Sequence, residues 1–159
     1  MKFLTVYISR TGNTERVARK VFKALGGDIE LITEQMNRKG IIGWMRSGGQ
    51  NSRREAAEID PLQFNPSDYD LVVLASPVWA GAVSAPMRGY MTQHAEKLVK
   101  TAVFLSNDSG DVEEAFAEIR KILLNKPLVE GALQRSKIKS KFEQSVTAFI
   151  ERISSKTML

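Results

Sequence analysis

A short loop near the start of the chain has the residues of a phosphate site. Residues 9–14 read Ser-Arg-Thr-Gly-Asn-Thr, and Ser9, Thr11 and Thr14 offer hydroxyl donors. Gly12 allows backbone angles that other residues avoid, and a helical pattern follows directly. Successive backbone N–H groups would therefore point outward at a helix N-terminus, where the helix dipole favours a negative charge. The loop predicts a site for one terminal phosphate.

Two better-known phosphate loops are excluded by the residues around Gly12. No Gly-Lys-Ser/Thr follows it, as a Walker A loop requires, and no G-x-G-x-x-G pattern occurs in the chain. Magnesium and a long polyphosphate are therefore not expected, and no metal site is predicted. The alternative interpretation is an ordinary helix N-cap, in which Thr11 or Asn13 only caps the following helix.

Two further loops carry polar residues or glycine at the end of an apolar strand. Residues 76–81 read Ser-Pro-Val-Trp-Ala-Gly, and residues 106–111 read Ser-Asn-Asp-Ser-Gly-Asp. The carboxyl ends of neighbouring parallel strands meet at one edge of a sheet, so the three loops are expected to converge there. Trp79, between Pro77 and Gly81, is expected to be an exposed loop residue with a flat apolar face. The alternative for Trp79 is a core position.

The elements that must position these loops alternate along the chain. Val17, Val21 and Leu25 recur at four-residue spacing after the first loop, which predicts a helix that ends at Gly26-Gly27. Leu71–Ala75 is continuously apolar, as a central parallel strand requires. The expected strands are 2–8, 29–32, 69–75, 102–105 and 128–129, and the expected helices are 14–25, 85–93, 112–124 and 137–153. This alternation predicts an α/β fold, with helices on both faces of a parallel sheet.

The remaining segments give weaker patterns. Residues 35–66 are rich in glycine and basic residues, and we consider them irregular, with candidate short helices at 41–46 and 52–57. Residues 154–159 are expected to fray. The chain has 159 residues, of which 43% are hydrophobic, and this predicts a single domain over residues 1–159.

The composition excludes several classes of chemistry. The chain has no cysteine, which rules out disulfides, cysteine nucleophiles and Cys-ligated iron–sulfur clusters. Its one histidine, His94, is expected to lie on the surface at a helix end without a catalytic role. No catalytic side chain is predicted, and redox chemistry would need an organic cofactor.

The charge and the N-terminus bear on partners and location. The 23 lysines and arginines exceed the 18 acidic residues, but they are scattered along the chain. We therefore expect a solvated basic surface that could dock on acidic proteins, rather than a nucleic-acid site. The apolar stretch at residues 3–8 is too short for a secretion signal, and no segment reaches the length of a membrane span. A cytoplasmic, soluble protein without membrane contact is expected.

The first two loops resemble the flavodoxin family. Residues 9–14 match its FMN phosphate loop, Ser/Thr-x-Thr-Gly-Asn-Thr, and Tyr69–Gly81 is similar to the third strand and flavin loop of microbial flavodoxin-like proteins. The resemblance implies FMN as cofactor, with the first loop on the phosphate, the second lining the isoalloxazine, and the third at its pyrimidine edge. The implied cofactor-binding residues are Ser9, Arg10, Thr11, Gly12, Asn13, Thr14, Pro77, Val78, Trp79, Ala80, Gly81, Ser106, Asn107, Asp108, Ser109, Gly110 and Asp111.

The resemblance also implies a topology. Flavodoxins are themselves a standard example of ligand binding at a switch point, and their doubly wound, five-stranded parallel sheet has the order 2-1-3-4-5. The chain has no room for the insertion of long-chain flavodoxins, so it resembles the short-chain kind. Two features differ from the family pattern: residues 106–111 contain no aromatic residue, and the net charge is +5 rather than acidic. Trp44 or Met45 could cover the flavin face that the missing aromatic leaves open.

Three functions follow from the resemblance. The first is an electron carrier that moves electrons on FMN between redox partner proteins, with acidic partners favoured by the basic charge. The second is an FMN-dependent reductase of quinones or other small acceptors that uses NADH or NADPH, although no separate nicotinamide-binding motif occurs. The third is an interaction module without flavin, which the nearly complete phosphate loop argues against.

Overall fold

A parallel sheet forms the centre of the computed structural model, which describes residues 1–34, 40–108 and 111–158. Within these ranges the parallel strands are β1 (Phe3–Tyr7), β2 (Asp28–Leu31), β3 (Leu71–Trp79), β5 (Thr101–Asn107) and β6 (Val129–Gln134). Their order is β2-β1-β3-β5-β6, and the two-residue strand β4 (Ala82–Val83) pairs antiparallel with β3. With β4 set aside, this is the predicted order 2-1-3-4-5, and the predicted doubly wound α/β fold is confirmed.

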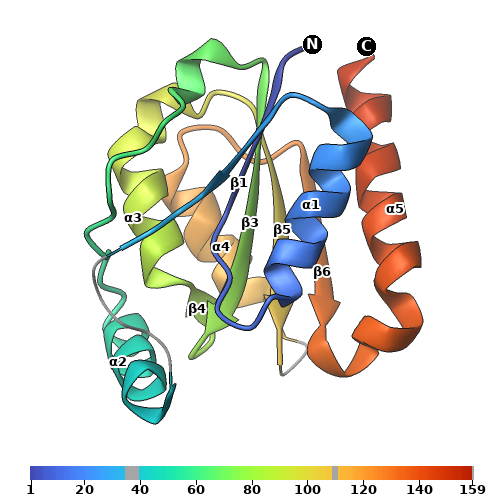
Figure 1. Cartoon of the computed structure of the whole chain (residues 1–159). Helices are drawn as coiled ribbons and strands as arrows, with labels where there is room; N and C mark the ends of the chain where they lie inside the picture. Colours follow the sequence, from blue (N-terminus) through green and yellow to red (C-terminus); the bar gives the residue numbers. More distant parts are fainter. Residues whose placement is uncertain (35–39, 109–110, 159) are drawn as a thin grey trace.

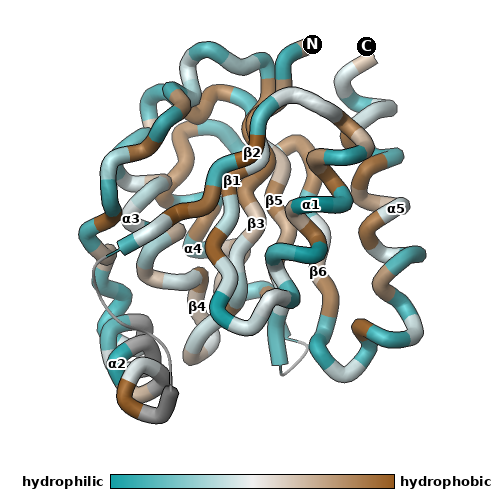
Figure 2. The backbone as a smooth tube through the Cα atoms, in the orientation of Figure 1, coloured by the Kyte–Doolittle hydropathy of each residue, from teal (hydrophilic) through white to brown (hydrophobic). Residues whose placement is uncertain are grey.

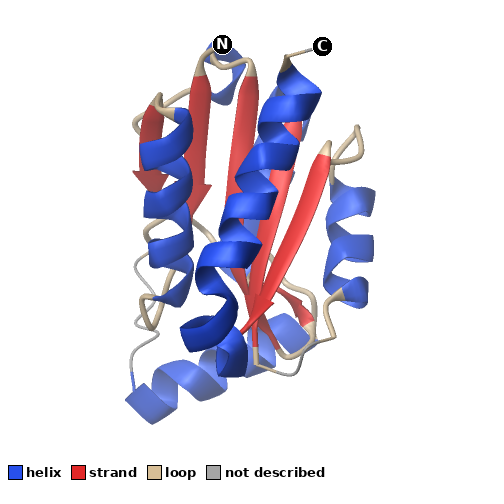
Figure 3. Cartoon of the chain, turned by 90° about the vertical axis from the view of Figure 1, so that its right-hand side faces the viewer, coloured by secondary structure: helices blue, strands red, loops and turns tan. Residues whose placement is uncertain are grey.

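The helices form a layer on each face of the sheet. They are α1 (Asn13–Leu25), α3 (Ala85–His94), α4 (Glu113–Ile122) and α5 (Ile138–Thr157), whereas α2 (Gly40–Ser52) lies at the lower end of the molecule (Figure 1). One core, which includes Val17, Val73 and Phe149, lies between α1, α5 and the sheet (Figure 3), and a second core lies between the sheet and α3 and α4. Both chain termini lie at the upper end of the molecule, and α1 begins at the lower end, beside β4 (Figure 1).

The central strands are apolar because both of their faces are covered. Figure 2 shows the brown of hydrophobic residues along β1, β3 and β5 between the two helical layers. Leu71, Val73 and Leu74 are at most 1% exposed, as the continuous apolar run predicted. None of the helices in the described ranges combines the length and the apolar character needed to cross a bilayer.

Strand β3 continues beyond the predicted end at Ala75. Ser76 and Pro77 pair with β5, and Val78 and Trp79 pair with β4 across a turn at Ala80-Gly81. Ala80 and Gly81 both have positive φ, 50° and 74°, as tight hairpin turns require. The prediction of a loop over 76–81 is therefore wrong for residues 76–79, because the antiparallel partner keeps the chain extended after the parallel pairing ends.

Two other elements differ from the sequence patterns. Strand β6 extends to Gln134, beyond the predicted 128–129, and Gly131 lies where an added Cβ would be 2.8 Å from Phe149 and 2.9 Å from Phe104. The glycine weakens the strand signal but makes room for these two rings, whose centroids are 5.1 Å apart. Helix α5 continues to Thr157, so the expected fraying of 154–157 is wrong.

The segment after α2 does not form the predicted second helix at 52–57. Helix α2 ends at Ser52, and Arg54 has a φ of 56°, which a helix does not allow. The chain then runs extended, and the Ala57 amide donates to the Ala85 carbonyl at 3.0 Å. Gly89 faces this segment so closely that a Cβ there would collide with the Ala57 carbonyl.

A buried arginine ties this segment to the β3–β4 hairpin. Arg88 is 4% exposed and donates to the carbonyls of Glu55 at 2.7 Å and Val83 at 2.9 Å. Its Nε pairs with the Glu118 carboxylate, which also accepts from the Val83 amide at 3.3 Å. Through this ion pair and its two hydrogen bonds to backbone carbonyls, Arg88 connects α3 with α4, β4 and the segment after α2.

We expect Arg88→Met to destabilise the fold strongly. The substitution removes the donor to the Glu55 and Val83 carbonyls and leaves Glu118 with Arg54 as its remaining cation, and each unsatisfied buried polar group costs about 1–3 kcal/mol. Urea denaturation followed by circular dichroism measures the change. The matched control is Arg53→Met, because Arg53 pairs with Glu55 but its side chain is 65% exposed, and exposed pairs stabilise little. Equal midpoints for Arg88→Met and the parent would show that this pair does not hold the hairpin.

Candidate functional site

Residues from all three predicted loops line one cavity at the carboxyl edge of the sheet. The first loop contributes Arg10, Thr11, Asn13 and Thr14; the β3 end contributes Pro77, Val78 and Trp79; the β5 end contributes Ser106, Asn107 and Asp108. The predicted convergence of the loops is therefore present in the structure. It follows from the register of the sheet, which places Tyr7 beside Ala75 and Pro77 beside Ser106.

The N-terminus of α1 opens into this cavity. Gly12 is its N-cap with a φ of 90°, and the Gly12 amide donates to the Ser9 hydroxyl at 3.0 Å. The first hydrogen bond of the helix runs from the Arg16 amide to the Gly12 carbonyl. The amides of the preceding residues in the first turn thus point out of the helix end. No side chain caps the helix, so the alternative of a Thr11 or Asn13 cap does not apply.

Thr14 links the first loop to the end of β5. Its hydroxyl lies 2.6 Å from the Ser106 hydroxyl, and Thr14 is 2% exposed. This buried hydrogen bond fixes the start of α1 against β5. Thr11, in contrast, is exposed and lines the cavity.

Trp79 is not the exposed loop residue that the sequence predicted. It ends strand β3, is 8% exposed, and belongs to the core between the sheet and α3 and α4. Its ring still borders the cavity, where the Arg10 guanidinium lies 5.6 Å from the ring centroid. The side chain therefore belongs to the core and also lines the cavity. That it lines a flavin ring, as the resemblance implies, stays a prediction.

The cavity is small, and its lining includes two arginines, Arg10 and Arg135. Its volume is about 50 Å³, and one water needs about 10–15 Å³ of such space. This volume suits a phosphate-sized group but does not enclose a tricyclic ring, which would have to lie at the mouth or displace side chains.

Two cavity residues were missed by the sequence analysis. Arg135 and Ile138 follow β6 and lie at the start of α5. The predicted strand stopped at residue 129, so the loop after it was not assigned to this edge of the sheet. A signal existed in the basic residues at 135–141, which directly follow the true end of β6. Arg135 is 64% exposed and lies 3.8 Å from the Asp108 carboxylate.

Other predicted site residues lie outside the cavity lining. Ser9 and Gly12 support the turn, Ala80 and Gly81 form the hairpin turn, and the Asp111 carboxylate accepts from the Glu113 amide just before α4. Ser109 and Gly110 are outside the described residues. Met45 is 63% exposed on α2 and does not line the cavity, and the side chain of Trp44 is outside the described part of the chain.

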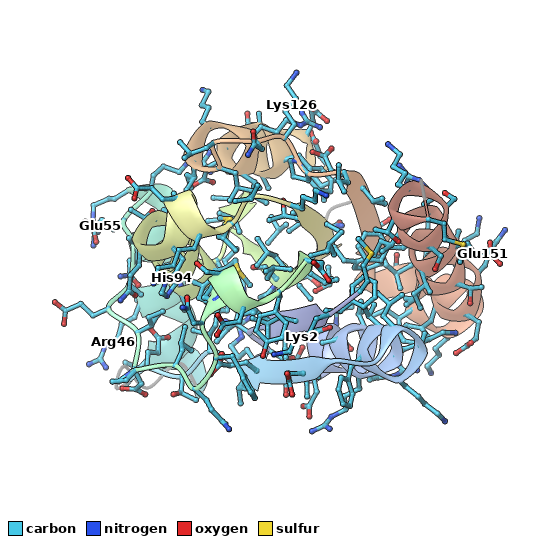
Figure 4. The ribbon with its side chains drawn as sticks, turned by 90° about the horizontal axis from the view of Figure 1, so that it is seen from above. Lys2, Arg46, Glu55, His94, Lys126 and Glu151 are labelled. Atoms are coloured by element: carbon cyan, nitrogen blue, oxygen red, sulfur yellow. The ribbon has the colours of Figure 1, made fainter. Side chains whose placement is uncertain are left out.

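His94 lies at the opposite end of the molecule, which Figure 4 views end-on. It ends α3, as predicted, but it is half-buried rather than on the surface, with its ring 4.9 Å from that of Tyr90. Burial lowers the pKa of His94, and the charge of Lys97 acts in the same direction. His94 is not among the residues that line the cavity.

Comparisons with known proteins identify the fold. No protein-family model matches the sequence, and no curated protein sequence matches it either. The structure is similar to a flavoprotein from Lactobacillus acidophilus NCFM solved in complex with FMN, at 18% identity and a TM-score of 0.69 over 87% of this chain and 96% of that one. A putative flavoprotein from Bacteroides eggerthii has 20% identity and a TM-score of 0.71, over 91% and 97%. Oxidised flavodoxin 2 from Bacillus cereus has 17% identity and a TM-score of 0.56, over 98% and 99%. The fold is therefore flavodoxin-like.

We expect Trp79→Ala to lower stability, which an exposed loop tryptophan would not do. Removal of a buried aromatic side chain costs about 3–5 kcal/mol through lost burial and the cavity left behind. Urea denaturation gives the free energy of unfolding. Trp79→Phe is the matched variant and should cost clearly less, because it keeps an aromatic ring in the core. Parent-like stability of Trp79→Ala would contradict its place in the core.

Proposed function

We propose that this chain binds FMN at the cavity and carries electrons on it between proteins. The observation that carries the proposal is the convergence of a helix N-terminus, hydroxyl donors and a tryptophan at one edge of a flavodoxin-like sheet. The Lactobacillus acidophilus and Bacillus cereus structures support it, because one was solved with FMN and the other is an oxidised flavodoxin.

The phosphate of FMN fits the α1 end of the cavity. Its oxygens accept hydrogen bonds, and this end supplies outward amides and the hydroxyl of Thr11. The left-handed Gly12 turns the chain so that these donors face one point, and the helix dipole adds attraction for a dianion. The cavity volume of about 50 Å³ matches this part of the ligand.

The flavin ring fits the β3 and β5 ends. Pro77, Val78 and Trp79 give an apolar wall, and Ser106 and Asn107 bring polar groups to the end of β5. FMN supplies reversible one- and two-electron chemistry when bound. The chain's own residues bind the cofactor, orient it at the sheet edge and set the charge around it, and none acts as an acid, base or nucleophile.

The partners we propose are redox proteins with acidic surfaces. The net charge is +5, and Arg10 and Arg135 stand at the cavity itself. Complementary charge would bring an acidic partner to the edge where electrons leave. We also expect Arg38 and Lys39 to assist docking, and both lie outside the described residues. A cytoplasmic location is part of this proposal.

The second candidate function is an FMN-dependent reductase that takes hydride from NADH or NADPH. The observation that favours it is that, among the described side chains, neither Met45 nor the end of β5 covers the cavity with a second large ring or apolar group. An uncovered flavin face would admit a nicotinamide ring.

Thr11→Val should reduce the affinity for FMN while it leaves riboflavin binding unchanged. A hydrogen bond to a charged group contributes about 1.5–3 kcal/mol, so the dissociation constant should rise at least about tenfold. Riboflavin lacks the phosphate that Thr11 would contact. Titration of both flavins, followed by flavin fluorescence, measures the two constants.

The control for this substitution is Thr147→Val, an exposed threonine on α5 away from the cavity. Thr14→Val is less suitable, because it would leave the buried Ser106 hydroxyl without its partner. Equal affinities of the parent for FMN and riboflavin would overturn the phosphate site.

A carrier and a reductase respond differently to nicotinamide nucleotides. We expect that NADH or NADPH alone, mixed anaerobically with the FMN-loaded protein, leaves the flavin absorbance unchanged over minutes, whereas dithionite bleaches it. Rapid bleaching by either nucleotide would favour the reductase.

A further inference from the structure

The Arg10 side chain leaves the phosphate loop and lies on Trp79. Its backbone belongs to the loop before α1, but its guanidinium is 5.6 Å from the ring centroid of Trp79, which ends β3. Cation–π attraction of this kind is effective within about 6 Å of a ring centroid. The positive charge is therefore held against the wall that the ring of a ligand would approach.

Among the described residues, Arg10 differs from Arg135, the other arginine that lines the cavity, in having no carboxylate partner. Arg135 lies 3.8 Å from the Asp108 carboxylate. Within the part of the chain that the structure describes, no carboxylate lies within ion-pair distance of Arg10. Arg10 is also half-buried, so water screens its charge less than that of an exposed side chain.

We propose that Arg10, held on Trp79, is the group that the flavin ring meets, and that its charge makes the site bind reduced FMN more tightly than oxidised FMN. This inference rests on the proposed function. Reduction adds two electrons and one proton to the ring and leaves it with one negative charge, whereas the oxidised ring is neutral. The electrons come from a reducing partner, or from dithionite in the experiment. A nearby unpaired cation therefore favours the reduced form.

The position of Trp79 gives this role to Arg10 rather than to the indole. Trp79 is 8% exposed, and the guanidinium lies over its ring. Trp79 therefore positions Arg10, and Arg10 presents the charge. The outward amides of α1 and Thr11 remain for the phosphate, which has the same charge in both redox states.

The experiment distinguishes an effect of Arg10 on the flavin ring from a contact of Arg10 with the phosphate. FMN and riboflavin are titrated into the parent and into Arg10→Gln, and the midpoint potential of bound FMN is measured with dithionite and indicator dyes. We expect the ratio of reduced to oxidised affinity to fall at least tenfold in Arg10→Gln, which is about 30 mV for a two-electron couple. The ratio of FMN to riboflavin affinity should match that of the parent.

Arg16→Gln is the matched control. Arg16 lies in α1, outside the cavity lining, with its guanidinium 4.5 Å from the ring centroid of Phe142. It loses the same charge and the same kind of contact, and its midpoint potential should stay that of the parent. Arg10→Lys keeps the charge and should restore most of the parent potential.

The outcomes distinguish the inference from the proposed function. A lower FMN-to-riboflavin ratio with an unchanged potential would mean that Arg10 contacts the phosphate, which overturns the inference and leaves FMN binding intact. Equal shifts in Arg10→Gln and Arg16→Gln would overturn it as well. If Arg10→Gln binds no flavin, the Arg10→Lys variant is used instead. A midpoint potential like that of the parent supports the inference, and a tenfold lower ratio of reduced to oxidised FMN affinity contradicts it. A parent that binds no FMN would overturn the proposed function itself, and the inference with it.

Discussion

The structure depends on the in-register parallel pairing of β3 with its two neighbours. Tyr7 lies beside Ala75, and Ala75 lies beside Phe104, so three strands reach the same edge of the sheet together. The residues that follow each strand must therefore share one region, whatever their separation in the sequence. The hydrogen bond between Thr14 and Ser106, which are 92 positions apart, is the direct product of this register. A strand shifted by one residue would exchange the side chains that pack on its two faces and would move the loops relative to one another.

A second constraint fixes the wall of the cavity on the β3 side. The extension of β3 from Val78 to Trp79 would end in solvent without its pairing to β4. That short hairpin is held from outside by Arg88 and Glu118, and both contact Val83. The ion pair is buried, and such pairs contribute specificity of position as often as net stability. The wall at Trp79 is thus built into the core, while the wall at α1 is a loop.

The sequence predicted what local patterns determine and missed what distant contacts determine. The loop over residues 9–14 and the helices α1, α3, α4 and α5 follow from motifs and periodicity, whereas the order of the strands was implied by the family resemblance. Trp79 was placed in an exposed loop because Pro77 and Gly81 are turn residues, and no local signal reveals the β4 partner. Gly131 made the predicted strand shorter than β6 is. Its lack of a side chain is explained only by the folded structure, where Phe104 and Phe149 occupy the space that a Cβ would need. Arg135 was missed because the predicted strand stopped at residue 129, before the true end of β6 at Gln134.

The two walls also divide the electrostatics of the site. The α1 side attracts anions through backbone amides, whose partial charges are fixed and the same for any ligand of the right shape. The β3 side is apolar and has no charge of its own; the charge there is brought by Arg10 from the opposite loop and held by the Trp79 ring. An acid beside Arg10 would cancel that field, as Asp108 partly does for Arg135. If the fixed dipoles of α1 hold the phosphate and the Arg10 charge faces the flavin ring, as we propose, substitutions can change affinity and redox preference separately.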